Sequence, residues 1–134
     1  MGYQRICAKI DLNAIEKNVA GVRARIPEDT KIMAVIKADA YGHGAAVLAR
    51  FLDDKADWFG VATADEAAEL RAHGCRKPIL ILGYVHPEEY PILVQKNITT
   101  AIFRYEDAKQ LSDMALSEGK TADIHIKIDT GMCR

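Results

Sequence analysis

Several features that would direct this chain to a membrane, to nucleic acid or to an oxidising compartment are absent from its sequence. Residues 1–12 lack the charged start and the apolar run of a signal peptide, and no apolar run is long enough to span a bilayer. The 18 basic and 19 acidic residues give a formal charge of −1, with no basic block that would neutralise phosphates. These absences predict a cytoplasmic protein that binds neither membranes nor nucleic acid.

Cysteine and metal-ligand patterns are also scarce. The 3 cysteines form neither a CxxC pair nor an even set, so we expect reduced thiols rather than a disulfide framework. None of the 4 histidines has metal-ligand spacing to a second histidine or to a cysteine. The sequence therefore predicts no metal site.

What the chain does contain is a regular alternation of strand-like and helix-like segments. Runs of β-type apolar residues begin near residues 32, 58, 79, 99 and 122, with helical patterns between them. A short strand over 5–10 and a helix over 12–26 precede these runs. The rhythm is typical of α/β folds with a parallel sheet, and both a doubly wound sheet and a (β/α)8 barrel fit it. Because a complete barrel needs roughly 250 residues, the chain is expected to form one domain that is either a small open sheet or part of a barrel.

A single lysine, Lys37, follows the strand-like run KIMAVI where that strand is expected to end. Side chains at the carboxyl ends of parallel strands face the ligand crevice, and a lysine that loses its proton there can attack an aldehyde. Tyr41 can return its hydroxyl to the same rim, while Gly42 and Gly44 allow the backbone to approach a ligand closely. Taken alone, Lys37 is more simply explained as a strand-end lysine that extends into water.

The last strand-like run, ADIHIKID, alternates apolar and polar residues. Its two faces carry different side chains, with Ile124, Ile126 and Ile128 on one and His125, Lys127 and Asp129 on the other. An interior amine at Lys127 would need a partner or a modification that removes its positive charge. An alternating strand with one hydrated face explains the same pattern equally well.

The segment AVIKADAYGHG, residues 34–44, closely resembles the pyridoxal-phosphate attachment segment of alanine racemases. The resemblance continues in AKIDLNAIEKNV, GVATADEAAELR, PILILG and HIKIDTGMCR, and so covers essentially the whole chain. Alanine racemases are fold-type III enzymes in which a (β/α)8 barrel precedes a β-rich C-terminal domain. The resemblance therefore implies an α/β fold in which residues 1–134 are the N-terminal part of a pyridoxal 5′-phosphate-binding (β/α)8 barrel domain. About five parallel strands would follow an N-terminal strand and helix, and the C-terminal β domain would be absent from this chain.

The resemblance also implies roles for individual residues. In that family the lysine that matches Lys37 carries the cofactor as an internal aldimine and acts as the base on one face of the substrate carbon. The tyrosine that matches Tyr41 binds the cofactor phosphate, and the arginine that matches Arg134 binds near the cofactor's phenolic oxygen and the substrate carboxylate. In many members the lysine that matches Lys127 is carbamylated, and as an anion it positions that arginine. One departure is Cys133, which stands where a glycine is usual, and its Cβ could restrict the turn that aims Arg134.

The function implied by this resemblance is the racemisation of a small amino acid, first of all L-alanine to the D-alanine used in peptidoglycan. The family enzymes are homodimers, because a tyrosine from the partner's C-terminal domain supplies the second base. That tyrosine lies outside these 134 residues, so we expect this chain alone to be inactive. A non-catalytic barrel that carries pyridoxal phosphate and a structural half-barrel fragment remain alternatives.

A partial barrel would also leave an unpaired edge at its last strand. The remainder of the enzyme or further copies of the partial barrel would have to cover that edge, unless the chain is one product of cleavage after Arg134.

Overall fold

A computed structural model of the protein describes residues 6–133, which divide into two compact units between Thr30 and Lys31. The first unit contains one helix, α1 (Leu12–Arg23). Its N-cap is Asp11, whose carboxylate accepts hydrogen bonds from the N–H groups of Asn13 (2.9 Å) and Ala14 (3.2 Å). The helix predicted over 12–26 is therefore confirmed, although it ends earlier than predicted.

The strand predicted over 5–10 is not formed by residues 6–10, and Arg5 lies outside the described residues. A strand needs a neighbour to complete its backbone hydrogen bonds, and none of the strands in the described part of the chain pairs with this segment. The side chain of Ile6 is correspondingly 92% exposed. This part of the prediction is wrong, because apolar alternation alone supplies no pairing partner.

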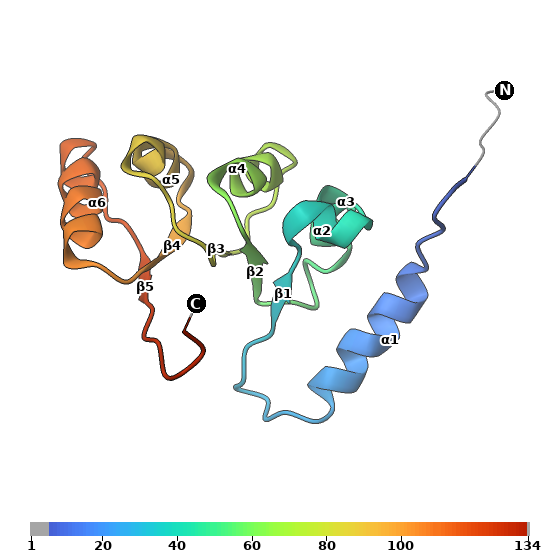
Figure 1. The fold of residues 1–134 in the computed structure, drawn as a ribbon. Coiled ribbons are helices and arrows are strands. Elements are labelled where there is room, and N and C mark those ends of the chain that lie inside the picture. The colour runs from blue at the N-terminus through green and yellow to red at the C-terminus, as the bar shows by residue number, and fades with distance from the viewer. Residues whose placement is uncertain (1–5, 134) are drawn as a thin grey trace, which may run out of the picture. The chain divides into compact units, whose positions relative to one another are not determined.

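The second unit is built on a parallel sheet in which the strand order follows the chain order (Figure 1). Its five strands are β1 (Met33–Val35), β2 (Trp58–Val61), β3 (Ile79–Ile81), β4 (Thr99–Ile102) and β5 (Ile124–Ile126). Neighbouring strands are in close register; for example, Ala34 lies beside Phe59, which lies beside Ile79. The five strands predicted near residues 32, 58, 79, 99 and 122, and the α/β class, are confirmed.

Helices connect successive strands and cover one face of this sheet. They are α2 (Lys37–Gly42), α3 (Ala45–Phe51), α4 (Ala64–Ala72), the 3₁₀ turn η1 (Pro87–Glu89), α5 (Tyr90–Lys96) and α6 (Tyr105–Ser117). Figure 1 shows α3 to α6 side by side above the sheet. Phe59, Val61, Ile79 and Ile81 lie in this helix-covered layer and are fully buried. None of the helices in residues 6–133 is long and apolar enough to cross a membrane.

The helix α3 buries one of its faces. The side chain of Val47 lies off that face and is 57% exposed. Leu48 and Leu52 are buried and stand four residues apart on one helical face. Because neighbouring helix positions are separated by about 100°, Val47 is rotated away from that face.

The opposite face of the sheet is concave. Trp58 on β2 and His125 on β5 bring their ring centroids to 5.4 Å, although two strands lie between them. In a flat sheet these strands would be roughly 14 Å apart, so the sheet must curl for the rings to meet. A cavity of about 350 Å³ lies here, lined by Lys31, Met33, Trp58 and His125. The curvature favours the barrel over the doubly wound sheet.

The outer face of β5 is open in the described residues. Ile126 and Ile128 are each 76% exposed, and Ile124 is 38% exposed. These three isoleucines alternate with polar residues, as predicted. Within residues 6–133, the apolar side chains of this last strand segment are therefore largely uncovered.

A single arginine, Arg71, joins the ends of the helices α4 and α5. The Arg71 guanidinium donates hydrogen bonds to four carbonyl oxygens, those of Cys75 (2.8 Å), Lys77 (2.8 Å), Lys96 (3.0 Å) and Asn97 (2.9 Å). These carbonyls belong to the chain that follows α4 and to the end of α5. Only the planar guanidinium fork can reach all four at once.

We predict that Arg71→Lys lowers the free energy of unfolding by about 2 kcal/mol, because an ammonium retains the charge but cannot make the four bonds. Denaturant unfolding of the variant measures this loss. Arg76→Lys is the matched control, since Arg76 is exposed a few residues away. Equal stability of the two variants would contradict the assigned role of Arg71.

Candidate functional site

The candidate site begins where β1 ends. Lys37 follows this strand directly, and its side chain is half-buried. Its Nζ lies 6.0 Å from the centroid of the Tyr41 ring, at the limit of a cation–π contact. The structure thus brings together two of the residues predicted for the site, Lys37 and Tyr41.

The backbone between these two residues is unusual. Ala38, Asp39, Ala40 and Tyr41 have φ values between 51° and 56° and ψ values between 36° and 52°, so α2 is a turn of left-handed helix. Each non-glycine residue in this conformation costs about 1–2 kcal/mol. Such a turn persists only where surrounding contacts fix it, and strained backbone of this kind is concentrated at functional sites.

Hydrogen bonds at both ends of the turn hold it in place. The Ala40 N–H donates to the Ile36 carbonyl (2.9 Å), and the Gly44 N–H donates to the Asp39 carbonyl (2.9 Å). The Asp39 carboxylate accepts from the Ala45 N–H at the start of α3 (2.7 Å). Gly44 itself has φ of 91°, a conformation suited to glycine. The turn is therefore continuous with the start of α3.

Glu66 supplies a further restraint that sequence analysis missed. The Thr63–Glu66 spacing suggests a capping box, and the Thr63 hydroxyl does accept from the Glu66 N–H (3.2 Å). The Glu66 carboxylate, however, accepts from the N–H groups of Ala62 (2.7 Å) and Ala38 (2.8 Å). It therefore connects the β2–α4 loop to the residue that follows Lys37. No local sequence signal identifies a contact between residues 28 positions apart.

The other predicted site residues lie after β5. The Lys127 N–H extends the sheet by donating to the Ile102 carbonyl (2.8 Å), and the Lys127 side chain is exposed. The Asp129 carboxylate accepts from the N–H groups of Gly131 (2.9 Å) and Cys133 (3.0 Å), and these bonds, first that of Cys133, lower the pKa of Asp129. Arg134 lies outside the described residues, so its predicted contacts with Lys127, the cofactor and the substrate stay predictions.

Cys133, which stands where the resemblance leads us to expect a glycine, has a backbone conformation that favours glycine. Its φ is 54°, in the left-handed region that a Cβ disfavours. The two hydrogen bonds to Asp129 hold the loop in spite of this cost. The turn is therefore formed although this position holds a cysteine instead of a glycine.

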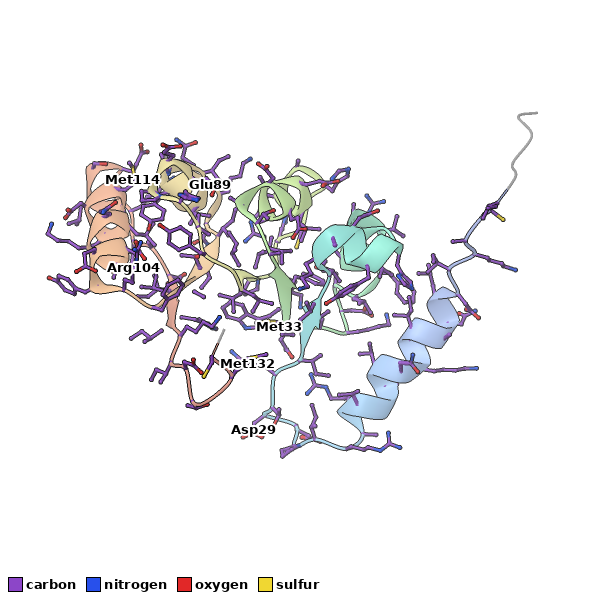
Figure 2. The ribbon with its side chains drawn as sticks, viewed as in Figure 1. Asp29, Met33, Glu89, Arg104, Met114 and Met132 are labelled. Carbon is purple, nitrogen blue, oxygen red and sulfur yellow. The ribbon has the colours of Figure 1, made fainter. Side chains whose placement is uncertain are left out.

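A second polar group that the sequence did not reveal lies after β3 and β4. Arg104, which stands between β4 and α6 and is labelled in Figure 2, donates to both oxygens of the buried Asp107 (2.7 and 2.8 Å) and to the Tyr84 hydroxyl (3.0 Å). The hydrogen bonds from the Arg104 guanidinium stabilise the Asp107 anion and so lower the pKa of Asp107. Tyr84 also contacts the rings of His86 (5.0 Å) and Phe103 (5.9 Å). These contacts place an aromatic and cationic cluster at the carboxyl ends of β3 and β4.

The described residues contain no group of three or more His, Cys, Asp or Glu side chains arranged to hold a metal ion. The loop after β1 instead carries the primary amine of Lys37 and the phenol hydroxyl of Tyr41. Tyr41 is 60% exposed, so that its hydroxyl can reach a ligand. These groups suit a ligand with an aldehyde and an anionic group better than a metal ion.

Comparisons with known proteins agree with this arrangement. The family model described as alanine racemase, N-terminal domain, matches residues 10–134. Alanine racemase 1 of Caldanaerobacter subterraneus subsp. tengcongensis is 44% identical over 134 residues, which cover 99% of this chain and 34% of that protein. The chain spans about a third of the length of the curated relatives it matches.

Solved structures give the same picture. Alanine racemase of Clostridium difficile 630 superposes with a TM-score of 0.90 at 40% identity, over 92% of this chain and 32% of that one. Histidine racemase of Leuconostoc mesenteroides subsp. sake superposes with a TM-score of 0.83 at 31% identity, over 92% and 33% of the two chains. The same portion of fold thus occurs in proteins named for different amino acids.

The left-handed turn can be tested by glycine substitution. Because glycine adopts positive φ without penalty, we predict that Ala38→Gly leaves the free energy of unfolding unchanged or raises it. The matched control is Ala68→Gly in the right-handed helix α4, which should lower it by about 1 kcal/mol. Denaturant unfolding distinguishes the two variants. A loss at Ala38 as large as that at Ala68 would argue against a left-handed turn.

Proposed function

The chain belongs to the family of alanine racemase N-terminal domains, and on this premise we propose that it forms the N-terminal part of the barrel domain of a racemase. The proposed reaction is the interconversion of L- and D-alanine with pyridoxal 5′-phosphate. In this proposal residues 1–134 contribute the lysine end of the site, and later parts of the enzyme complete it.

The position of Lys37 is the observation that carries the proposal. This amine stands at the carboxyl end of β1, half-buried, beside Tyr41 and on a turn whose strained backbone is fixed by hydrogen bonds. The carboxyl ends of all five strands lie along the same edge of the curved sheet, and barrel enzymes have their active sites at that edge. A surface lysine without a function would not require a turn this costly.

The residues present fit the cofactor. An aldehyde requires a primary amine, which Lys37 offers, and a phosphate requires donors, which the exposed Tyr41 hydroxyl can provide. When bound, pyridoxal phosphate withdraws electrons from the substrate α-carbon and so makes its proton easier to remove. We propose that Lys37 holds the cofactor and that Tyr41 donates a hydrogen bond to its phosphate.

Lys37 has a second proposed role in proton transfer. Its amine would take the α-proton from one face of the substrate and return it to that face in the reverse reaction. Arg134 would bind the substrate carboxylate, and a carbamylated Lys127 would hold the Arg134 guanidinium in a fixed orientation. Inversion at carbon needs a base on the other face, which we propose comes from the partner subunit of a homodimer.

Alanine is proposed as the substrate because the curated relatives with about 40% identity are named alanine racemases. The superposition with a histidine racemase makes another amino acid the second candidate. Activity of the complete protein on a panel of L-amino acids separates these substrates.

Removing the amine gives the most direct test of the proposed reaction. We expect Lys37→Ala to abolish conversion of L- to D-alanine by the protein made from its complete reading frame, because no other group replaces the amine. Lys109→Ala is the control, since that exposed lysine pairs with Asp113 on α6. Unchanged conversion by Lys37→Ala would refute the proposal. Absence of conversion by the unaltered protein, with cofactor bound, would favour a non-catalytic barrel.

The role of Tyr41 is tested by removing one oxygen. Because a hydrogen bond to a charged group contributes about 1.5–3 kcal/mol, Tyr41→Phe should weaken binding of pyridoxal phosphate about tenfold or more. Titration of the apoprotein with the cofactor measures the dissociation constant. Tyr105→Phe, at an exposed position at the start of α6, should leave that constant unchanged. An equal constant in both variants would rule out the phosphate contact.

A further inference from the structure

The Glu66 carboxylate bridges two loops at the mouth of the sheet. One oxygen accepts from the Ala38 N–H (2.8 Å) and the other from the Ala62 N–H (2.7 Å). Glu66 stands in the first turn of α4, and Ala62 directly follows β2. Ala38 belongs to the turn that follows β1. A single side chain therefore links the ends of two adjacent strands.

This arrangement differs from ordinary helix capping. In a capping box the glutamate accepts from the N–H of the N-cap residue, which here is Thr63. Glu66 instead uses both oxygens for N–H groups outside α4. Two short bonds to one carboxylate are charge-assisted, and such bonds are roughly twice as strong as neutral ones. The geometry thus favours a role in holding the loops over a role in starting the helix.

The Ala62 carbonyl lies close to the loop that follows β3. A Cβ added to Gly83, which follows β3, would stand only 2.9 Å from the Ala62 carbonyl oxygen. The absence of a side chain at Gly83 allows the β3 loop to lie directly against this peptide. The β3 loop thus packs against Ala62, and the Glu66 carboxylate links the Ala62 N–H to the Ala38 N–H.

Ala38 is the first residue of the left-handed turn, and its nitrogen is bonded to the carbonyl carbon of Lys37. The peptide plane that contains the Ala38 N–H also contains the Lys37 carbonyl and ends at the Lys37 Cα. An anchor on this N–H therefore restrains the direction in which the Lys37 side chain leaves the backbone. The bonds of the Asp39 carboxylate and of the Ala40 N–H act further along the turn.

We propose that Glu66 is a positioning residue for Lys37. It anchors the Ala38 N–H to the end of β2 and so keeps the Lys37 amine directed toward the ligand. This inference rests on the proposed function, because it assigns Glu66 the task of aiming an amine that binds an aldehyde. Glu66 does not itself touch the reacting atoms.

The test compares Glu66→Gln with Asp65→Asn in the protein made from its complete reading frame. Glutamine keeps the shape of the side chain but offers one acceptor oxygen in place of two, so one of the two N–H groups loses its bond. Asp65 stands beside Glu66 in the first turn of α4 and is exposed. Its substitution removes the same charge from the same helix end and leaves the bridge intact.

The first measurement is hydrogen exchange at the Ala38 and Ala62 amides. We expect at least one of these two amides to exchange at least about tenfold faster in Glu66→Gln than in Asp65→Asn, as loss of a charge-assisted bond should allow. The second measurement is the rate at which pyridoxal phosphate becomes attached to Lys37, read by peptide mass after borohydride reduction. Misplacement of the amine should slow attachment about tenfold or more in Glu66→Gln at equal folded fraction.

Three results would overturn the inference. Equal exchange at both the Ala38 and the Ala62 amides, with equal attachment rates in the two folded variants, would show that the bridge does not position Lys37. Equal losses in both variants would assign the effect to charge alone. Failure of the unaltered protein to attach pyridoxal phosphate at Lys37 would refute the proposed function and, with it, this inference.

If Glu66→Gln does not fold, Glu66→Asp provides the second variant. It retains the charge but is one methylene too short to reach both N–H groups. We expect slower attachment at Lys37 than in Asp65→Asn, and an unchanged rate would contradict the positioning role.

Discussion

Lys37, at the end of β1, is followed by four consecutive residues held in a left-handed conformation. At about 1–2 kcal/mol for each residue, this turn is among the most costly local features of the chain. The bonds that offset the cost come from three sources, namely the backbone on either side, the Asp39 carboxylate and the Glu66 carboxylate. Strain that is restrained in this way places a side chain more narrowly than a relaxed loop does.

The curved parallel sheet explains why these contacts converge. Consecutive strands pair in order, so the loops that follow β1, β2 and β3 lie next to one another at the carboxyl end. Glu66 reaches from the second loop to the first, and Gly83 lets the third loop lie against the second. The helix-covered face supplies the buried apolar layer that stabilises the sheet. The site is therefore a consequence of the sheet's order and curvature as well as of its own sequence.

Much of the fold could be predicted from the sequence, because apolar periodicity and capping residues are local signals. The five strands and α1 follow from such signals. The prediction of a strand over 5–10 was wrong, because the pairing of a strand with a neighbour depends on tertiary contacts that local patterns do not reveal. For the same reason, the sequence could not decide between a doubly wound sheet and a barrel. The contact between the rings of Trp58 and His125 favours the barrel.

The candidate site was only partly predictable. Lys37 and Tyr41 could be identified from their segment and are close together in the structure. The left-handed turn was missed because alanine residues rarely adopt positive φ, so no propensity points to it. The bridge through Glu66 was missed because it joins loops distant in sequence, and the roles of Lys127 and Arg134 stay predictions.

The central claim is that the left-handed turn presents Lys37 to an aldehyde cofactor. An electron-density map of the complete protein with pyridoxal phosphate tests it most directly. The account predicts continuous density from the Lys37 Nζ to the cofactor, positive φ at residues 38–41 and the Tyr41 hydroxyl at the phosphate. Density that joins the cofactor to another lysine, or a turn with negative φ, would contradict it.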